Sequence, residues 1–282
     1  MEQTSLIPPI VTLTQVLEST WKYIWCDVRY ALDGSDGYQA YLRGHIPGAR
    51  YVSMDRDLAA PAGPIVGRHP LPTTQVFAES LGKLGVSYDD VVIAYDAVGG
   101  RFAGRMVWML RILGQQAALL DGGLQAWQDQ VPNTKLETTQ PTWREVQRQA
   151  VEWPSHEIVT ADEVANHLAS GGQVVDARAP ERFRGDVEPI DPQAGHIPGA
   201  RNLFLGDNYQ DVSNYFKKTS DLALRFGQAG FDAQTICYCG SGVTACNNVL
   251  AAEMAGLPRP RVYVGSWSGW SSEPGRPVET GD

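Results

Sequence analysis

GHIPGAR at residues 44–50 is repeated without change at residues 195–201. In both copies a short apolar segment that ends in an aspartate and an arginine comes first, YIWCDVR at 23–29 and QVVDAR at 173–178. Self-similarity on this scale is the mark of a duplicated structural unit. The two halves of the chain are therefore expected to share one fold.

The match between the halves continues downstream of the heptapeptide. VVIAYD at 91–96 aligns with TICYC at 235–239, which sets Asp96 opposite Cys239. LLDGGLQAW at 119–127 aligns with VYVGSWSGW at 262–270. If only one half keeps a nucleophile at the shared position, one half is catalytic and the other is structural.

Short β-branched segments alternate with helical patterns in both halves. Such alternation predicts an α/β fold, with a parallel β-sheet in each half that is flanked by helices on both faces. The expected strands are 23–27, 91–95, 117–120, 174–176, 235–238 and 261–264. The expected helices are 73–84, 102–113, 161–168 and 243–255, and Thr160 with Glu163 forms a capping box before the third.

A chain of 282 residues with 43 % hydrophobic residues can form two domains of ordinary size. We expect a non-catalytic N-terminal domain at 1–128 and a catalytic C-terminal domain at 156–282. The intervening residues 129–155 are polar and interrupted by prolines, which is typical of a linker.

Composition restricts the partners and the compartment. The net charge of −9 comes without a basic cluster, which argues against a nucleic-acid partner. The N-terminus carries no basic leader, and no segment approaches the roughly 20 apolar residues of a membrane span, so we expect no membrane partner. Four cysteines are too few for a disulfide framework. These features predict a cytoplasmic protein with reduced thiols.

CYCGSGVTAC at 237–246 gathers three of the four cysteines after an apolar strand. A zinc site would need more paired ligands than one Cys-x-Cys and a lone cysteine. A disulfide through Cys237 is disfavoured, because residues two apart on a strand are poorly placed for bridging. A phosphatase loop would carry an arginine where this chain has Ala245.

A sulfur nucleophile fits this loop best. Small residues after Cys239 let the backbone curl so that successive amides converge on the sulfur before the helix, which favours the thiolate. The alternative for Cys239 is a buried thiol at a strand end. We interpret Cys237 as part of the strand, Cys246 as part of the following helix and Cys26 as a core residue.

The chain resembles the two-domain rhodanese family of sulfurtransferases over essentially its whole length. The resemblance rests on the repeated GHIPGA, on GSWSGW at 265–270 and on CGSGVTA at 239–245. It implies that Cys239 carries a persulfide, with no organic cofactor and no metal. Family members that use 3-mercaptopyruvate carry CGSGVT, whereas those that use thiosulfate carry cations after the cysteine. The implied substrate-binding loop consists of Gly240, Ser241, Gly242, Val243 and Thr244.

The resemblance also implies residues outside the loop. Arg182 would bind the carboxylate of the donor, while a second arginine that the family places in an EPR sequence is Ile190 here, so that Arg184 or another residue would have to replace it. A relay that polarises the donor would join Ser241, His69 and Asp55, with Asp57 as the alternative partner of His69.

Two other functions stay open. The first is thiosulfate sulfur transfer through the same cysteine, and the second is a non-catalytic rhodanese-fold module that binds partners or senses oxidants. In the leading hypothesis the partners are a small-molecule sulfur donor and a thiol acceptor, such as a thioredoxin-like protein or a small thiol.

Overall fold

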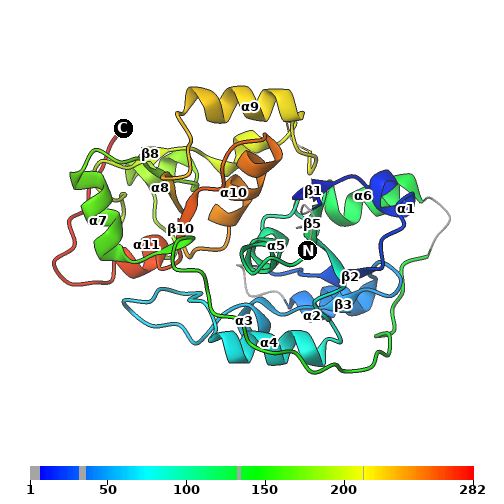
Figure 1. Cartoon of the computed structure of the whole chain (residues 1–282). Coiled ribbons are helices and arrows are strands. Elements are labelled where there is room, and N and C mark those ends of the chain that lie inside the picture. Colours follow the sequence, from blue (N-terminus) through cyan, green and yellow to red (C-terminus); the bar gives the residue numbers. More distant parts are fainter. Residues whose placement is uncertain (1–6, 32–35, 132–134, 212) are drawn as a thin grey trace, which may run out of the picture. The chain divides into compact units, whose positions relative to one another are not determined.

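The computed structural model describes residues 7–31, 36–131, 135–211 and 213–282 (Figure 1). The chain forms two compact units, each assembled from separate stretches of sequence. The first unit contains residues 1–58, 72–153 and 212–216, and the second contains residues 59–71, 154–211 and 217–282.

Each unit is built on a five-stranded parallel sheet. The first sheet has the order β1-β5-β4-β2-β3, and its strands are β1 Ile10–Val11, β2 Tyr23–Asp27, β3 Arg50–Tyr51, β4 Val91–Tyr95 and β5 Ala117–Leu120. The second has the order β6-β10-β9-β7-β8, and its strands are β6 Ile158–Val159, β7 Val174–Asp176, β8 Arg201–Asn202, β9 Ile236–Tyr238 and β10 Arg261–Tyr263. The two orders correspond strand by strand, so the predicted α/β fold and the duplication are confirmed.

Helices cover both faces of the first sheet. They are α1 Leu13–Leu17, α2 Gly37–Arg43, α3 Met54–Asp57, α4 Thr74–Lys83, α5 Ala103–Ile112 and α6 Gly123–Gln130. On one face, Leu13 of α1 and Trp127 of α6 pack with Ile93 and Ala118 of the strands. Since side chains alternate along a strand, neighbouring strand residues point to the opposite face, where α5 contacts β4 and β5.

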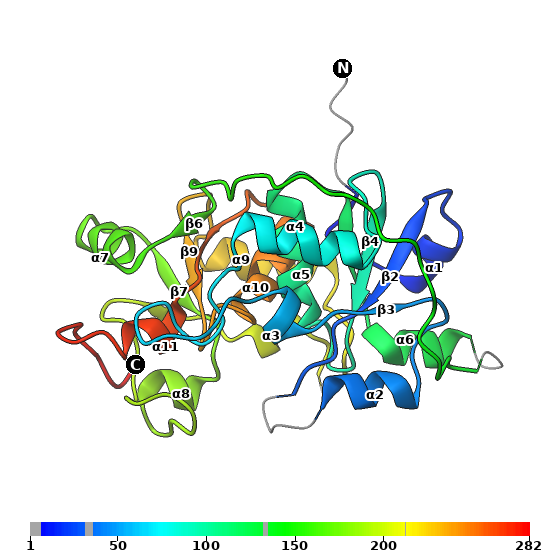
Figure 2. The same cartoon turned by 90° about the horizontal axis from the view of Figure 1, so that it is seen from below.

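The second sheet is covered in the same way (Figures 1 and 2). Its helices are α7 Ala161–Ala169, α8 Pro180–Arg184, the 3-10 helix η1 Leu205–Asn208, α9 Thr219–Gln228, α10 Ala245–Met254 and α11 Ser266–Trp270. Val164, Phe183 and Trp267 bring α7, α8 and α11 into one core with the strands. The helix α10 contacts β9, β10 and α9. The predicted capping box of α7 forms between Thr160 and Glu163.

The repeated heptapeptide is hydrogen-bonded to the end of the strand that precedes it, β2 in the first unit and β7 in the second. In each unit an arginine bridges the strand-end aspartate and the carbonyl oxygen of the first glycine of the repeat, with N–O distances of 2.6–2.7 Å. These residues are Arg29, Asp27 and Gly44 in the first unit and Arg178, Asp176 and Gly195 in the second. The repeat is therefore structural in both units.

The compact units differ from the continuous domains expected at 1–128 and 156–282. Residues 59–71 of the N-terminal half belong to the second unit. They turn back through a bridge between Gly63 and Gly67, and the Arg68 amide donates to Ser268 Oγ at 3.1 Å. Residues 59–71 thus belong to the second unit because of tertiary hydrogen bonds, although they lie in the N-terminal half of the sequence.

The expected linker at 129–155 also differs, because residues up to 153 belong to the first unit. The indole of Trp143 donates to the carbonyl oxygen of Lys83 at 2.7 Å, and that of Trp153 donates to Pro72 at 2.9 Å. Indoles anchored in this way hold the polar segment along the first unit.

The two units use different groups in the loop that follows their central strand. In the first unit, the carboxylate of Asp96 accepts four backbone amide hydrogen bonds of 2.7–3.0 Å inside its own loop. The donors are Val98, Gly100, Phe102 and Ala103. Burial raises the pKa of Asp96, and the four amides oppose this shift. A buried carboxylate therefore holds this loop together, at the position that Cys239 occupies in the second unit.

None of the helices in the described part of the chain is long and apolar enough to span a bilayer.

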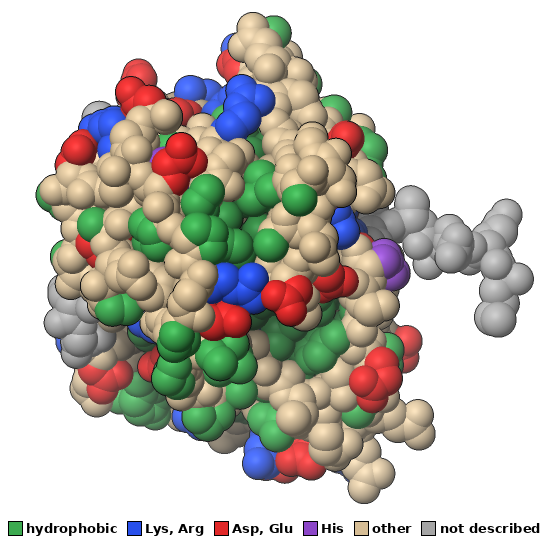
Figure 3. All heavy atoms as spheres, turned by 90° about the vertical axis from the view of Figure 1, so that its left-hand side faces the viewer, with side chains coloured by type: hydrophobic (Ala, Val, Ile, Leu, Met, Phe, Trp, Pro, Cys, Tyr) green, Lys and Arg blue, Asp and Glu red, His purple; other side chains and the backbone are tan. Residues whose placement is uncertain are grey.

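On the face drawn in Figure 3, acidic and basic side chains are interspersed among hydrophobic ones.

Removing the carboxylate of Asp96 should destabilise the first unit. In Asp96→Ala the loop amides lose their acceptor, and each buried donor without a partner costs about 1–3 kcal/mol. Two of the four donors, Gly100 and Ala103, are buried, so we expect a loss of about 2–6 kcal/mol in the free energy of unfolding, measured by urea titration followed by circular dichroism. The exposed Asp89→Ala is the control and should stay within about 0.5 kcal/mol of the parent. Equal stability of the two variants would contradict the structural role of Asp96.

Candidate functional site

The loop from Cys239 to Thr244 joins β9 to α10, and β9 lies in the middle of the second sheet between β10 and β7. In open parallel sheets, ligands bind beyond the carboxyl ends of the strands, where such loops lie. The loop predicted to be reactive therefore stands where this fold places its binding sites.

Backbone contacts set the position of the Cys239 sulfur. The amide of Gly242 donates to Cys239 Sγ at an N–S distance of 3.2 Å, and the amide of Cys239 donates to Ser266 Oγ at 3.1 Å. The loop carbonyls are held as well, because Trp267 donates to Cys239 O and Ser268 donates to Gly240 O, both at 2.9 Å. Cys239 is buried. The sulfur of this buried strand-end cysteine thus accepts a backbone hydrogen bond from its own loop.

Gly242 is what allows that amide to face the sulfur. Its φ of +74° lies in the left-handed region, and a Cβ atom there would come within 2.3 Å of the carbonyl oxygen of Val264. Only glycine fits both demands without strain. Val243 and Thr244 follow as the first turn that leads into α10, which begins at Ala245, two residues later than expected from the sequence.

The other cysteines have surroundings that suit core residues. Burial raises the pKa of Cys26 to about 12, and burial also raises the pKa of Cys237 well above its usual value. The thiol of Cys246 donates to the carbonyl oxygen of Gly242 at 3.5 Å. Among the residues that the structure describes, no group of three or more His, Cys, Asp or Glu side chains could hold a metal ion.

Two of the three expected relay residues meet in the second unit. The Nδ1 atom of His69 lies 2.9 Å from Ser241 Oγ, and both side chains are buried. His69 reaches this place because residues 59–71 belong to the same unit as the cysteine loop. The hydrogen bond orients both side chains.

Asp55 and Asp57 lie in α3 of the first unit. The carboxylate of Asp57 accepts hydrogen bonds from the Ser53 amide and from Arg56 Nη2, both at 2.8 Å. Asp57 is thus engaged in holding the start of its own helix. The assignment of Asp55 as the partner of His69 stays a prediction.

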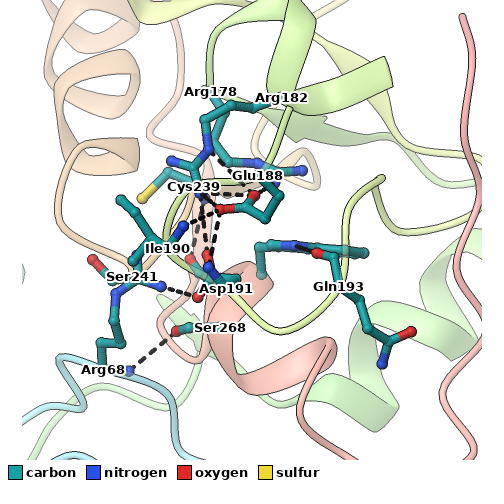
Figure 4. Close-up of polar contacts among 12 residues, drawn as sticks. Arg68, Arg178, Arg182, Glu188, Ile190, Asp191, Gln193, Cys239, Ser241 and Ser268 are labelled. Carbon is teal, nitrogen blue, oxygen red and sulfur yellow. Dashed lines mark hydrogen bonds and ion pairs between the residues drawn. The ribbon is translucent and has the colours of Figure 1, made fainter. Parts of the chain in front are cut away.

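Arg182, the expected ligand of the donor carboxylate, is engaged by acidic side chains of the second unit (Figure 4). Its Nη2 atom lies 2.7 and 2.9 Å from the two carboxylate oxygens of Glu188 and 3.1 Å from Asp191 Oδ2. Arg178 also contacts Glu188, at 3.3 Å. Arg182 is therefore present beside the cysteine loop, and its guanidinium group is paired with the carboxylates of Glu188 and Asp191.

Arg68 belongs to this group too, although sequence reasoning did not select it. Its guanidinium pairs with the carboxylate of Asp191. A Cβ atom built on Gly240 would lie 3.0 Å from Arg68 Nη2 and 3.4 Å from Arg182 Nη1. The only feature of the sequence that could have pointed to Arg68 is its position directly before His69. Arg184, the suggested replacement for the missing family arginine, instead pairs with Asp186 at 2.8 Å.

A pocket of about 290 Å³ opens beside Arg68 in the second unit. Its lining includes Ala62, Gly67, Arg68, Ile190, Asp191 and Ser268. The Arg68–Asp191 pair therefore borders a pocket of the second unit.

Comparison with known proteins agrees with this architecture. The family model described as "Rhodanese-like domain" matches residues 13–130 and 160–273. The chain is also similar to the crystal structure of SseA from Escherichia coli, whose description names 3-mercaptopyruvate sulfotransferases. The TM-score is 0.79 and the sequence identity is 30%. This likeness covers 93% of the chain and 99% of that structure.

Two curated relatives illustrate the activities found among similar sequences. A Pseudomonas aeruginosa protein named "Probable 3-mercaptopyruvate sulfurtransferase" is 42% identical over 91% of the chain and 92% of its own length. The thiosulfate sulfurtransferase of Azotobacter vinelandii is 36% identical over 85% of the chain and 87% of its own length. With both halves matched by the same family model, the chain belongs to the sulfurtransferases of the rhodanese family and carries two rhodanese-like domains in tandem.

Proposed function

We propose that this protein transfers a sulfane sulfur from 3-mercaptopyruvate to a thiol acceptor through a persulfide on Cys239. The observation that carries the proposal is the hydrogen bond from the Gly242 amide to Cys239 Sγ, in the loop at the carboxyl end of the central strand. A backbone donor at this place stabilises negative charge on sulfur. The relatives named 3-mercaptopyruvate sulfurtransferases support the choice of donor.

In the first half-reaction, the Cys239 thiolate attacks the sulfur atom of the donor. The S–S bond forms while the carbon–sulfur bond of 3-mercaptopyruvate breaks, and the electron pair of that bond passes to the enolate of pyruvate. Protonation of the enolate gives pyruvate. The protein is left with one extra sulfur on Cys239, and the Gly242 amide remains in place to stabilise it.

In the second half-reaction, an acceptor thiolate attacks the outer sulfur of the persulfide. The S–S bond to Cys239 breaks, the acceptor leaves as a persulfide and the Cys239 thiolate is restored. A small thiol or a thioredoxin-like protein provides this chemistry. A thiolate that must stay reduced between turnovers suits the cytoplasm, which we propose as the compartment.

Ser241 and His69 supply proton transfer in this scheme. The Ser241 hydroxyl is bonded to His69 Nδ1 at 2.9 Å and lies two residues after the nucleophile. Such a pair can polarise the donor carbonyl and deliver the proton that the enolate needs. In this proposal Asp55 is the expected partner of His69.

Thiosulfate transfer is the second candidate. The guanidinium groups of Arg68 and Arg182 beside Gly240 would also attract a dianionic donor, and one relative is named a thiosulfate sulfurtransferase. Both donors lead to the same persulfide, so the preferred donor is decided by turnover.

The proposal predicts an added sulfur on Cys239. After treatment with 3-mercaptopyruvate, intact-protein mass spectrometry should show the mass of one extra sulfur atom, and Cys239→Ser should lose both this adduct and all turnover. Cys26→Ala is the control that retains the adduct, because Cys26 is a core thiol of the first unit.

The donor assignment and the enzyme hypothesis fail in different ways. Turnover on thiosulfate equal to or better than that on 3-mercaptopyruvate would replace the donor. Unchanged sulfur transfer in Cys239→Ser would reject the nucleophile and favour the non-catalytic module.

Gly242→Ala should reduce persulfide formation together with stability. The added methyl group would meet the Val264 carbonyl, and φ would be strained, so we expect a loss of about 1–3 kcal/mol in unfolding free energy and a slower single turnover. Gly227→Ala is the matched control, because Gly227 lies in α9 with open space around its Cβ position. It should leave sulfur transfer unchanged and be neutral or stabilising by about 0.5–1 kcal/mol. Unimpaired persulfide formation in Gly242→Ala would argue against the amide as the stabilising group.

Ser241→Ala and His69→Ala should affect the two donors differently. Pyruvate leaves as an enolate that needs a proton, whereas sulfite leaves thiosulfate as a stable anion. We therefore expect kcat with 3-mercaptopyruvate to fall about 10²–10⁴-fold in both variants, with a much smaller change in persulfide formation from thiosulfate. Stopped-flow kinetics with both donors provide the measurement. An equal loss with both donors would assign this pair to positioning of the loop instead of proton transfer.

A further inference from the structure

The family resemblance implies two arginines that bind the carboxylate of the donor, and only one of them is present at its expected position. Arg182 is present, but the position of the second arginine holds Ile190, which is 43% exposed. Its backbone amide donates to Glu188 Oε1 at 3.1 Å, so this residue helps to shape the acidic turn. A second cation must come from elsewhere if the carboxylate of a donor is to be held from two sides.

Arg68 lies where such a cation is needed. The space above the Cα atom of Gly240 is bounded by Arg68 Nη2 at 3.0 Å and by Arg182 at 3.4 and 3.7 Å from the Cβ position. Gly240 follows Cys239 directly. Two guanidinium groups that arrive from separate segments thus flank the residue next to the nucleophile.

A carboxylate already bridges the two arginines. One oxygen of Asp191 pairs with Arg68 Nη1, and the other lies 3.1 Å from Arg182 Nη2 (Figure 4). This bridging geometry is the one that a donor carboxylate would adopt between the same two cations.

Asp191 is more easily exchanged than its neighbour Glu188. The carboxylate of Glu188 is bound by Arg178 and Arg182, and it also accepts from two backbone amides, those of Ile190 and Asp191, at 3.1 and 3.0 Å. Asp191 has ion pairs with Arg68 and Arg182 and borders the pocket of about 290 Å³. Replacement of Asp191 by an incoming carboxylate would leave the Glu188 network intact.

We propose that Arg68 is the second carboxylate-binding arginine of the donor site, and that Asp191 occupies Arg68 and Arg182 until a 2-oxo acid displaces it. The inference rests on the proposed function, since the ligand is the carboxylate of the donor or of its product. Arg68 thereby determines affinity for carboxylated donors, and Asp191 weakens it by competition.

Two variants that break the same ion pair test this proposal. Arg68→Ala removes a donor ligand and should raise KM for 3-mercaptopyruvate about 10–100-fold. Asp191→Asn removes the competing charge and should lower KM about 3–10-fold. The inhibition constant of pyruvate, a carboxylate without the reacting sulfur, should move in the same direction as KM in each variant. Both variants should still form the Cys239 persulfide at saturating donor.

A purely structural ion pair gives a different pattern. Because both substitutions break one contact, it predicts that KM and the pyruvate inhibition constant rise in both variants or stay unchanged in both. Either result would overturn the proposal. If Arg68→Ala does not fold, the sign of the change in Asp191→Asn alone decides. Arg184→Ala is the control, since its partner is Asp186, and its KM should be unchanged.

Failure of the proposed function is recognisable separately. It would appear as a parent protein that neither turns over 3-mercaptopyruvate nor gains sulfur on Cys239. If the parent is active and the two variants do not move KM in opposite directions, only the role of Arg68 and Asp191 is rejected.

Discussion

In both units a side chain at the end of the central strand accepts backbone amide hydrogen bonds from the loop that follows, and this constraint shapes the loop. In the first unit the acceptor is the carboxylate of Asp96, which receives four amides of its own loop. In the second unit the same position holds Cys239, whose sulfur receives the amide of Gly242. A carboxylate saturated by its own loop has no further chemistry, whereas a sulfur atom in the same setting is the group to which we assign the attack on the donor in the proposed function. One fold thus carries two versions of the same loop, one held by a carboxylate and one that presents a cysteine sulfur.

Small size near the nucleophile matters as much as charge. Gly242 must be glycine because the Val264 carbonyl occupies the space of a side chain. Gly240 leaves the space into which Arg68 and Arg182 project. A bulky residue at position 240 would displace both guanidinium groups. The cations of the site are therefore supplied by other segments, and the loop itself supplies amides and free volume.

Features that depend on consecutive residues could be predicted from the sequence. The expected strands 23–27, 91–95, 117–120 and 174–176 match the structure to the residue, because each is a short run of mostly apolar residues next to polar or glycine residues. The edge strands β1, β3, β6 and β8 have only two residues each, too few for any periodicity, and were not predicted. The cysteine loop could be proposed as a site from the sequence because Cys239 and its glycines are nearly consecutive. By contrast, the place of residues 59–71 depends on contacts such as that of Arg68 with Ser268, which are 200 positions apart. The pairing of Arg68 with Asp191 was hidden for the same reason.

Charge balance explains how three neighbouring arginines, one buried and two partly buried, can lie close together. Three guanidinium groups face three carboxylates, and the residues are Arg68, Arg178, Arg182, Asp176, Glu188 and Asp191. Uncompensated guanidinium groups with so little exposure would cost more than the contacts could return. In the donor site that we propose, an incoming carboxylate replaces a resident one, which keeps the balance, and the replaced side chain gains hydration as it leaves. Binding becomes an exchange of one carboxylate for another. Its free energy is small unless the incoming anion gains further contacts, and the reacting sulfur beside Cys239 is the contact that Asp191 cannot make.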